Sequence, residues 1–141
     1  MDNLELERWV EEVRDDVYAY LEGQGIQKPN IDEWPAFEVA PYFSIWAIES
    51  QRNPGKIGWW AFSGDCPTDY VSEDGECHPR AALKTLIENW QGYILHMKQG
   101  IQPPKTKIGK GENLYELAEL LSSRIDILRE WEEDDSIWRE N

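Results

Sequence analysis

Apolar side chains recur every three or four residues in three stretches of the chain, and this period predicts three amphipathic helices. They are expected over residues 4–22, about 79–99 and about 112–132. Glycines end the first two stretches, and Pro79 suits the first turn of the second helix, where a missing N–H costs nothing. The expected core faces consist of Leu6, Trp9, Val10, Val13, Val17, Tyr20 and Leu21, then Leu83, Leu86, Ile87, Trp90, Ile94 and Met97, and finally Leu114, Leu117, Leu121, Ile125 and Leu128.

The pattern between the first two helices is that of strands. Residues 36–50 and 56–63 are rich in aromatic and β-branched side chains, and Asn53-Pro54-Gly55 predicts the turn that joins them. Pro41 is expected at a strand start or an edge bulge. Residues 64–79 are expected to form a loop, in which residues 69–72 could add a short strand. Both main strands are apolar on both faces, which is typical of a sheet covered on both sides or of one that binds a partner.

These elements predict an α+β fold. A small antiparallel sheet of two to four strands is expected, with the N-terminal helix and two C-terminal helices packed on it. A chain of 141 residues is expected to form a single domain over residues 1–141. We expect the acidic tail, about residues 133–141, to be mobile.

Charge changes the picture mainly at the two ends of the chain. The formal net charge is −14, from 28 acidic and 14 basic side chains. Residues 1–22 hold eight acids and two bases, and residues 130–141 hold six acids and one base. This balance argues against binding nucleic acid or an anionic membrane. The acidic ends are either solvated helix surface, which we favour, or a patch that binds a basic partner.

The N-terminus and the two cysteines bear on the compartment. Residues 1–16 contain neither the basic region nor the apolar region of a secretion signal, and no apolar run approaches the roughly 18 residues of a membrane span. We therefore expect a cytoplasmic protein. Cys66 and Cys77 are expected to be free thiols, because disulfides are rare in that compartment.

The candidate chemistry lies in the predicted hairpin and just after it. If the turn at Pro54 is tight, Glu49 lies opposite Trp60, and desolvation by aromatic neighbours would raise its pKa. Carboxylates near one sheet end could bind a cation or act in acid–base chemistry. The structural alternative, which we favour, is that Glu49 accepts backbone hydrogen bonds or pairs with Arg52 or Lys56, and that Asp65 and Asp69 cap turns. The candidate binding residues are Trp46, Glu49, Trp59, Trp60, Ser63, Asp65, Asp69 and Tyr70.

The tryptophans, the possible nucleophile and the possible metal ligands bear on this candidate set. Adjacent Trp59 and Trp60 must point to opposite faces of the sheet, so one could line a pocket or an interface. Ser63 lacks the surroundings of a nucleophile elbow. Cys66, Cys77 and His78 lack the spacing of a zinc site. We therefore expect no metal, no cofactor and no catalytic residue.

The central motifs carry a resemblance. Trp46-Ala-Ile-Glu-Ser50, then Pro54-Gly-Lys-Ile-Gly-Trp-Trp60, then Ser63-Gly-Asp-Cys-Pro-Thr-Asp-Tyr70 resemble a family of small bacterial proteins that is a domain of unknown function. The likeness spans about residues 41–90 and is weaker in the flanking helices. It implies a bacterial, cytoplasmic origin and supplies no activity.

Two functions remain open from the sequence. The first is a protein-binding or regulatory module, of inhibitor or immunity type, with a basic protein as its partner. It is indicated by the acidic ends and by a tryptophan-rich hairpin that lacks a complete set of catalytic residues. The alternative is a small enzyme or ligand-binding protein that uses carboxylates beside that hairpin. The sequence is compatible with a monomer or a homodimer and leans against an enzyme.

Overall fold

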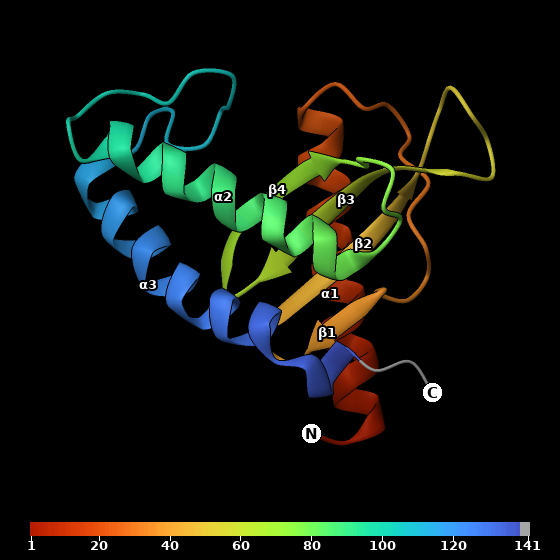
Figure 1. Ribbon diagram of the computed structural model, residues 1–141. Coiled ribbons are helices and arrows are strands. Elements are labelled where there is room, and N and C mark those ends of the chain that lie inside the picture. The colour runs from red at the N-terminus through yellow and green to blue at the C-terminus, as the bar shows by residue number, and fades with distance from the viewer. Residues whose placement is uncertain (139–141) are drawn as a thin grey trace. The chain divides into compact units, whose positions relative to one another are not determined.

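The computed structural model describes residues 1–138, and their elements fall into two compact units, residues 1–82 and the described residues from 83 onward. The first unit holds helix α1 (Asn3–Gly23) and strands β1 (Phe37–Val39), β2 (Phe43–Glu49), β3 (Ile57–Gly64) and β4 (Cys66–Ser72). The second holds most of helix α2 (Pro79–Met97), helix α3 (Leu114–Glu133) and the short 3₁₀ helix η1 (Asp135–Trp138). The predicted α+β fold, with one N-terminal helix, a small antiparallel sheet and two C-terminal helices, is confirmed (Figure 1).

Helix α1 has the boundaries that its sequence predicts. The Asp2 side chain caps its first turn by accepting a hydrogen bond of 2.8 Å from the Glu5 backbone N–H. At the other end Gly25 has φ +92°, and the Ile26 N–H donates to the Leu21 carbonyl at 3.0 Å. This is a Schellman C-cap, and it turns Ile26 back onto the apolar face of the helix.

The sheet is a meander in which every neighbouring pair is antiparallel, in the order β1-β2-β3-β4. The predicted turn at Asn53-Pro54-Gly55 is present, because the Lys56 N–H donates to the Asn53 carbonyl and Gly55 has φ +88°. The predicted strand over 36–50 is instead two strands, joined by a turn in which the Ala40–Pro41 peptide bond is cis. The optional strand at 69–72 is present and begins earlier, at Cys66.

Helix α1 covers one face of this sheet (Figure 1). The register pairs Trp46 with Ala61 and Ile48 with Trp59, and these side chains meet the apolar face of α1. The Arg14 guanidinium reinforces this packing, since it donates to the Ile31 carbonyl at 2.6 Å and the Asp32 carbonyl at 2.9 Å. The buried core of this layer consists of Val10, Val13, Val17, Leu21, Ile26, Ile31, Trp46, Ile48 and Ala61.

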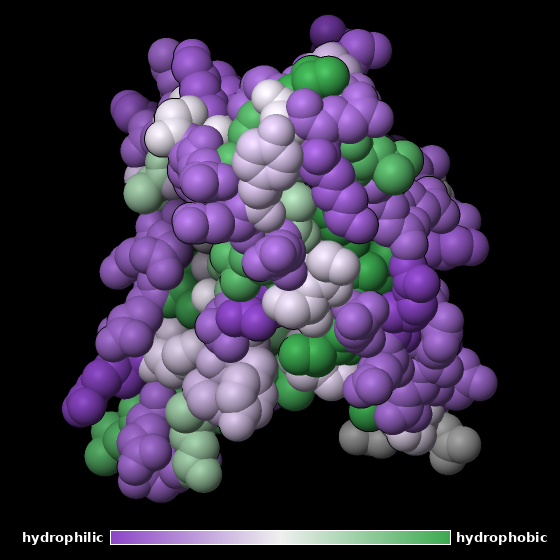
Figure 2. All heavy atoms as spheres, turned by 90° about the vertical axis from the view of Figure 1, so that its left-hand side faces the viewer, coloured by the Kyte–Doolittle hydropathy of each residue, from purple (hydrophilic) through white to green (hydrophobic). Residues whose placement is uncertain are grey.

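Helices α2 and α3 each begin with a capped turn. The His78 ring nitrogen accepts from the Arg80 N–H at 3.0 Å beside Pro79, and Asn113 caps α3 by accepting from the Glu116 N–H at 3.1 Å. The side chains predicted for the core faces of α2 and α3 are buried, apart from half-buried Leu114. Figure 2 shows apolar residues (green) that reach the surface between polar ones (purple).

Part of the acidic tail forms secondary structure. Residues 135–138 form η1, and the Trp138 indole N–H donates to the Trp131 carbonyl at 2.8 Å. The predicted mobile tail therefore contains a turn that folds back on the end of α3. The remainder of that tail, residues 139–141, lies outside the described residues.

Candidate functional site

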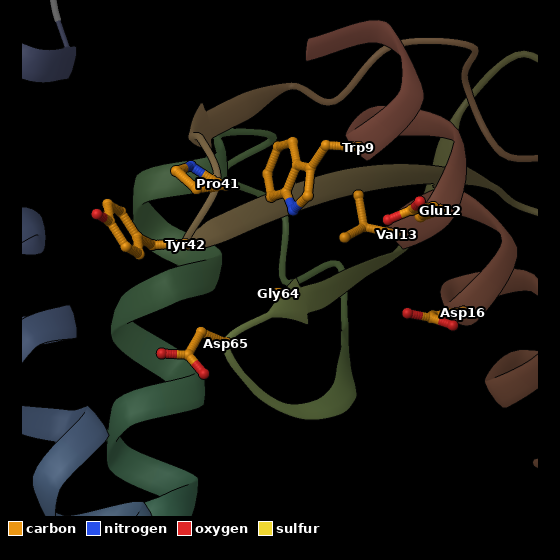
Figure 3. Close-up of a pocket in the computed structure, with 8 residues that line it drawn as sticks. All are labelled: Trp9, Glu12, Val13, Asp16, Pro41, Tyr42, Gly64 and Asp65. Carbon is orange, nitrogen blue, oxygen red and sulfur yellow. The ribbon is translucent and has the colours of Figure 1, made fainter. Parts of the chain in front are cut away.

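A groove opens between α1 and two turns of the sheet, entirely within the first unit (Figure 3). Its volume is about 430 Å³. We call it the acidic groove, and its lining residues are Trp9, Glu12, Val13, Asp16, Pro41, Tyr42, Gly64 and Asp65. Figure 3 shows the Trp9 indole between Pro41 on one side and Val13 on the other.

The helix side of the groove follows from spacing. Trp9, Glu12, Val13 and Asp16 lie at offsets of zero, three, four and seven, so they share one face of α1. Val13 is buried and Trp9 is half-buried against the core, whereas both carboxylates are exposed. The groove therefore lies where the apolar stripe of α1 meets its acidic face.

The sheet side of the groove consists of two turns held together. The Asp65 N–H donates to the Tyr42 carbonyl at 2.8 Å, which joins the turn after β3 to the turn after β1. Gly64 permits this approach, because it has φ +144° and a Cβ atom there would lie 2.9 Å from the Phe43 Cα. Tyr42 is left 57% exposed at the edge of the groove.

Three carboxylates and no basic side chain line the groove. Glu12 and Asp16 are four residues apart on a helix, where like charges repel each other by about 0.2–0.5 kcal/mol. Among the described residues, no group of three or more His, Cys, Asp or Glu side chains is arranged to hold a metal ion. The three carboxylates are distributed along the groove, which suits an extended organic cation better than a single ion. The aromatic rings of Trp9 and Tyr42 can add cation–π contacts.

Only one of the sequence-predicted site residues, Asp65, lines the acidic groove. Trp46, Trp60, Ser63 and Asp69 are buried, and Glu49, Trp59 and Tyr70 are half-buried. The remaining groove residues were assigned by the sequence to the core or the solvated face of the first helix, or were left without a role. The mixed stripe from Trp9 to Asp16 is the signal that could have found them.

The register corrects two expectations about the carboxylates. Trp60 pairs with Ala47, while Glu49 pairs with Ile57 after a bulge, so Glu49 does not lie opposite Trp60. Glu49 and Asp65 also lie at opposite ends of the β2–β3 hairpin, about 20 Å apart at the usual rise per strand residue. The expectation that these carboxylates gather at one sheet end is therefore wrong.

The other predicted site residues have partners within the fold. The Glu49 carboxylate accepts from the Asn30 amide and the Gly55 N–H, each at 3.1 Å. Asp69 accepts from the Tyr70 N–H at 2.8 Å and from the Tyr20 hydroxyl at 3.5 Å. The Gly55 contact is a backbone hydrogen bond of the kind that the structural alternative anticipated for Glu49, whereas Asp69 lies within β4 and not in a turn.

The buried tryptophans also have polar partners. The Trp46 indole N–H donates to the Ser44 hydroxyl at 2.9 Å, which in turn donates to the Ser63 carbonyl at 2.8 Å. Trp59 packs against the core under α1, while Trp60 donates to the Glu73 carboxylate at 3.1 Å. These contacts hold the tryptophans as structural groups.

Glu73, which the sequence did not single out, organises the loop between β4 and α2. Its carboxylate accepts from the Trp60 indole, from the Gly75 N–H at 2.6 Å, and from both the N–H and the thiol of Cys77. Burial raises the pKa of Glu73, but these hydrogen bonds outweigh it and hold the pKa below the ordinary value of 4.5. Glu73 in turn raises the pKa of the Cys77 thiol.

Both cysteines are free thiols in the structure, and Cys77 is exposed. A thiol that donates to a carboxylate and has a raised pKa is protonated at neutral pH. Because the thiolate is the nucleophile and the metal ligand, Cys77 is poorly suited to either role.

Glu73 predicts an acid-sensitive contribution to stability. Because its pKa is lower in the folded state, this contribution is complete above the unfolded value of 4.5 and is lost as the pH falls through the folded value. We expect Glu73→Gln to destabilise the protein at pH 7 and to differ less from the wild type at about pH 3. Urea unfolding of both proteins across this range measures the difference, and a constant difference would contradict the assignment.

The hydropathy of the helices and the comparisons with known proteins bear on the classification of the chain. Within residues 1–138, no helix is both long and apolar enough to cross a membrane. The family model described as "Domain of unknown function (DUF4826)" matches residues 4–138, which confirms the resemblance to a domain-of-unknown-function family at that level. No curated protein and no solved structure matches the chain. Because the match covers nearly the whole length, the chain belongs to this family, DUF4826.

Proposed function

We propose that this protein is a protein-binding regulatory module, of inhibitor or immunity type, and that its acidic groove receives a basic segment of its partner. The observation that carries the proposal is the lining of the groove, in which Trp9 and Tyr42 stand among three carboxylates without a basic side chain. Arginine suits such a site, because its guanidinium pairs with carboxylates and stacks on aromatic rings.

The position of the groove supports this function. It lies on α1, the more acidic end of the described chain, so long-range attraction and the local contacts act in the same direction. The side chains of Glu12 and Asp16 make no hydrogen bond or ion pair within residues 1–138, so their charge is available to a partner. A bound cation would also relieve their mutual repulsion along the helix.

The first test uses a short oligoarginine peptide as the probe. We expect it to bind with a Kd of about 10 µM at low salt, and the triple variant Glu12→Gln, Asp16→Asn, Asp65→Asn to weaken binding at least about tenfold. The matched control is Glu7→Gln, Glu11→Gln, Asp15→Asn, which removes the same charge from exposed positions of α1 outside the groove. Titration calorimetry measures all three proteins.

The control variant distinguishes binding in the acidic groove from general attraction by the net charge of the protein. If the two triple variants weaken binding equally, the peptide senses net charge alone and the groove is not the site. The native partner is then sought in cell lysate at low salt. A stoichiometric protein retained by the wild type and by the control variant, and lost from the groove variant, is the expected result.

A further inference from the structure

A second groove lies between α2 and α3, within the second unit, and its chemistry differs from that of the acidic groove. Its volume is about 310 Å³, and its apolar lining is Ile94, Leu95 and Ile125. Ile94 and Ile125 are buried, whereas Leu95 is 67% exposed. Exposed apolar area is unfavourable in water, so a leucine in this position beside a groove favours a covering partner.

Apolar side chains extend this surface beyond the groove. Tyr115 is exposed and lies seven residues before Ser122, which lines the groove, so the two share a face of α3. Gly100 approaches the ring of Tyr115 so closely that a Cβ atom there would lie 2.7 Å from the Tyr115 hydroxyl. The exposed side chain of Ile101 follows directly. We call the groove together with Ile101 and Tyr115 the helix-pair surface.

The charges on the helix-pair surface balance each other. Asp126 and Arg129 are three residues apart on α3, and both line the groove. They are the charged side chains of a groove that is neutral as a whole, in a chain whose net charge is −14. Gln91 adds an amide that can both donate and accept a hydrogen bond.

We propose that the helix-pair surface binds a second copy of this chain about a two-fold axis that crosses α3. In such a dimer the same patch meets itself, so Asp126 of each copy faces Arg129 of the other, and the two Gln91 amides can pair. A basic partner would meet Arg129 and an acidic partner would meet Asp126, whereas a second copy satisfies both charges. Leu95 of each copy then covers the apolar groove of the other.

Salt distinguishes this dimer from the groove complex proposed above. Two chains of charge −14 repel each other over long range, and salt screens that repulsion while leaving apolar contacts intact. Salt screens the Asp126–Arg129 pairs much less, because the dimer buries them. We therefore expect the dimer to strengthen with salt, whereas binding of a basic peptide to the acidic groove weakens. The two proposals can fail independently of each other.

The first test is sedimentation velocity of the full chain from about 1 µM to about 500 µM, at low and high salt. We expect a reversible monomer–dimer equilibrium that Leu95→Glu weakens at least about tenfold. Leu4→Glu is the matched control, because it makes the same substitution outside the helix-pair surface. Leu4 lies on α1 and is 73% exposed. A wild type that stays monomeric at every concentration, or a Leu95→Glu variant that dimerises normally, overturns the proposal.

A charge swap tests the geometry itself. Asp126→Arg alone and Arg129→Asp alone each place like charges across the axis, so each variant is expected to be monomeric while keeping its helical circular dichroism. The double variant restores the pairing with reversed signs and is expected to dimerise again, as is an equimolar mixture of the two single variants. A double variant that remains monomeric while folded overturns the two-fold pairing.

Discussion

Trp46→Ala is expected to lower the free energy of unfolding by about 4 kcal/mol, as is typical of a fully buried tryptophan. The side chain is completely buried between α1 and the sheet, where it joins the core that contains Val10, Val13 and Ile48. Truncation would leave a large cavity and would remove the indole N–H that donates to Ser44. Domains of this size have only about 5–15 kcal/mol of stability, so the variant is expected to lie near the folding threshold.

The matched control for this variant is Trp34→Ala. Trp34 is 47% exposed, and surface changes of this kind usually alter stability by less than about 0.5 kcal/mol. Urea unfolding followed by circular dichroism measures both variants without relying on the fluorescence of the residue removed. Equal losses of stability would show that Trp46 does not anchor the α1 layer.

Gly64→Ala is expected to cost about 3 kcal/mol, and it acts on the groove as well as on the fold. Gly64 has φ +144°, a conformation that side-chain-bearing residues rarely adopt, and an added Cβ would press on the backbone of Tyr42 and Phe43. Backbone atoms cannot rotate away as a side chain can. The two turns must therefore separate, which strains the Asp65–Tyr42 hydrogen bond and widens the acidic groove.

Gly55→Ala separates the two contributions. Gly55 also has a positive φ, +88°, but nothing lies within 4 Å of an added Cβ, so only the backbone conformation is penalised, by about 1 kcal/mol. We expect this variant to bind oligoarginine normally, and folded Gly64→Ala to bind it more weakly. Melting temperatures and calorimetry measure both effects. Identical losses in the two variants would mean that the close approach at Gly64 carries no cost.

The helices were predictable because each is a local pattern. The apolar stripe of α1, the glycine at φ +92° after it and Pro79 at the start of α2 all act within a few residues of one another. The β1–β2 turn was indicated only by Pro41, expected at a strand start or an edge bulge, because residues 39–42 contain no glycine or asparagine. The short strand β1 was therefore merged with β2 into a single predicted strand.

The candidate site was less predictable than the fold. Asp65 was identified from the motif in which it lies, whereas Glu12 and Asp16 were taken as part of a solvated acidic face. The hairpin register pairs Trp60 with Ala47, two residues before Glu49, and a bulge after Ile48 then pairs Glu49 with Ile57. Such a bulge depends on how the whole sheet twists and packs, so neighbouring residues do not reveal it.

The sequence by itself determined the three helices of this protein, the central hairpin and the acidic character of α1, because periodicity, caps and charge are properties of adjacent residues. Only the tertiary structure decided which carboxylates share a surface. The acidic groove joins α1 to turns some thirty and fifty residues further along the chain, and these contacts exist only once Gly64 and Tyr42 approach each other. Long-range proximity of this kind is set by strand register and helix packing.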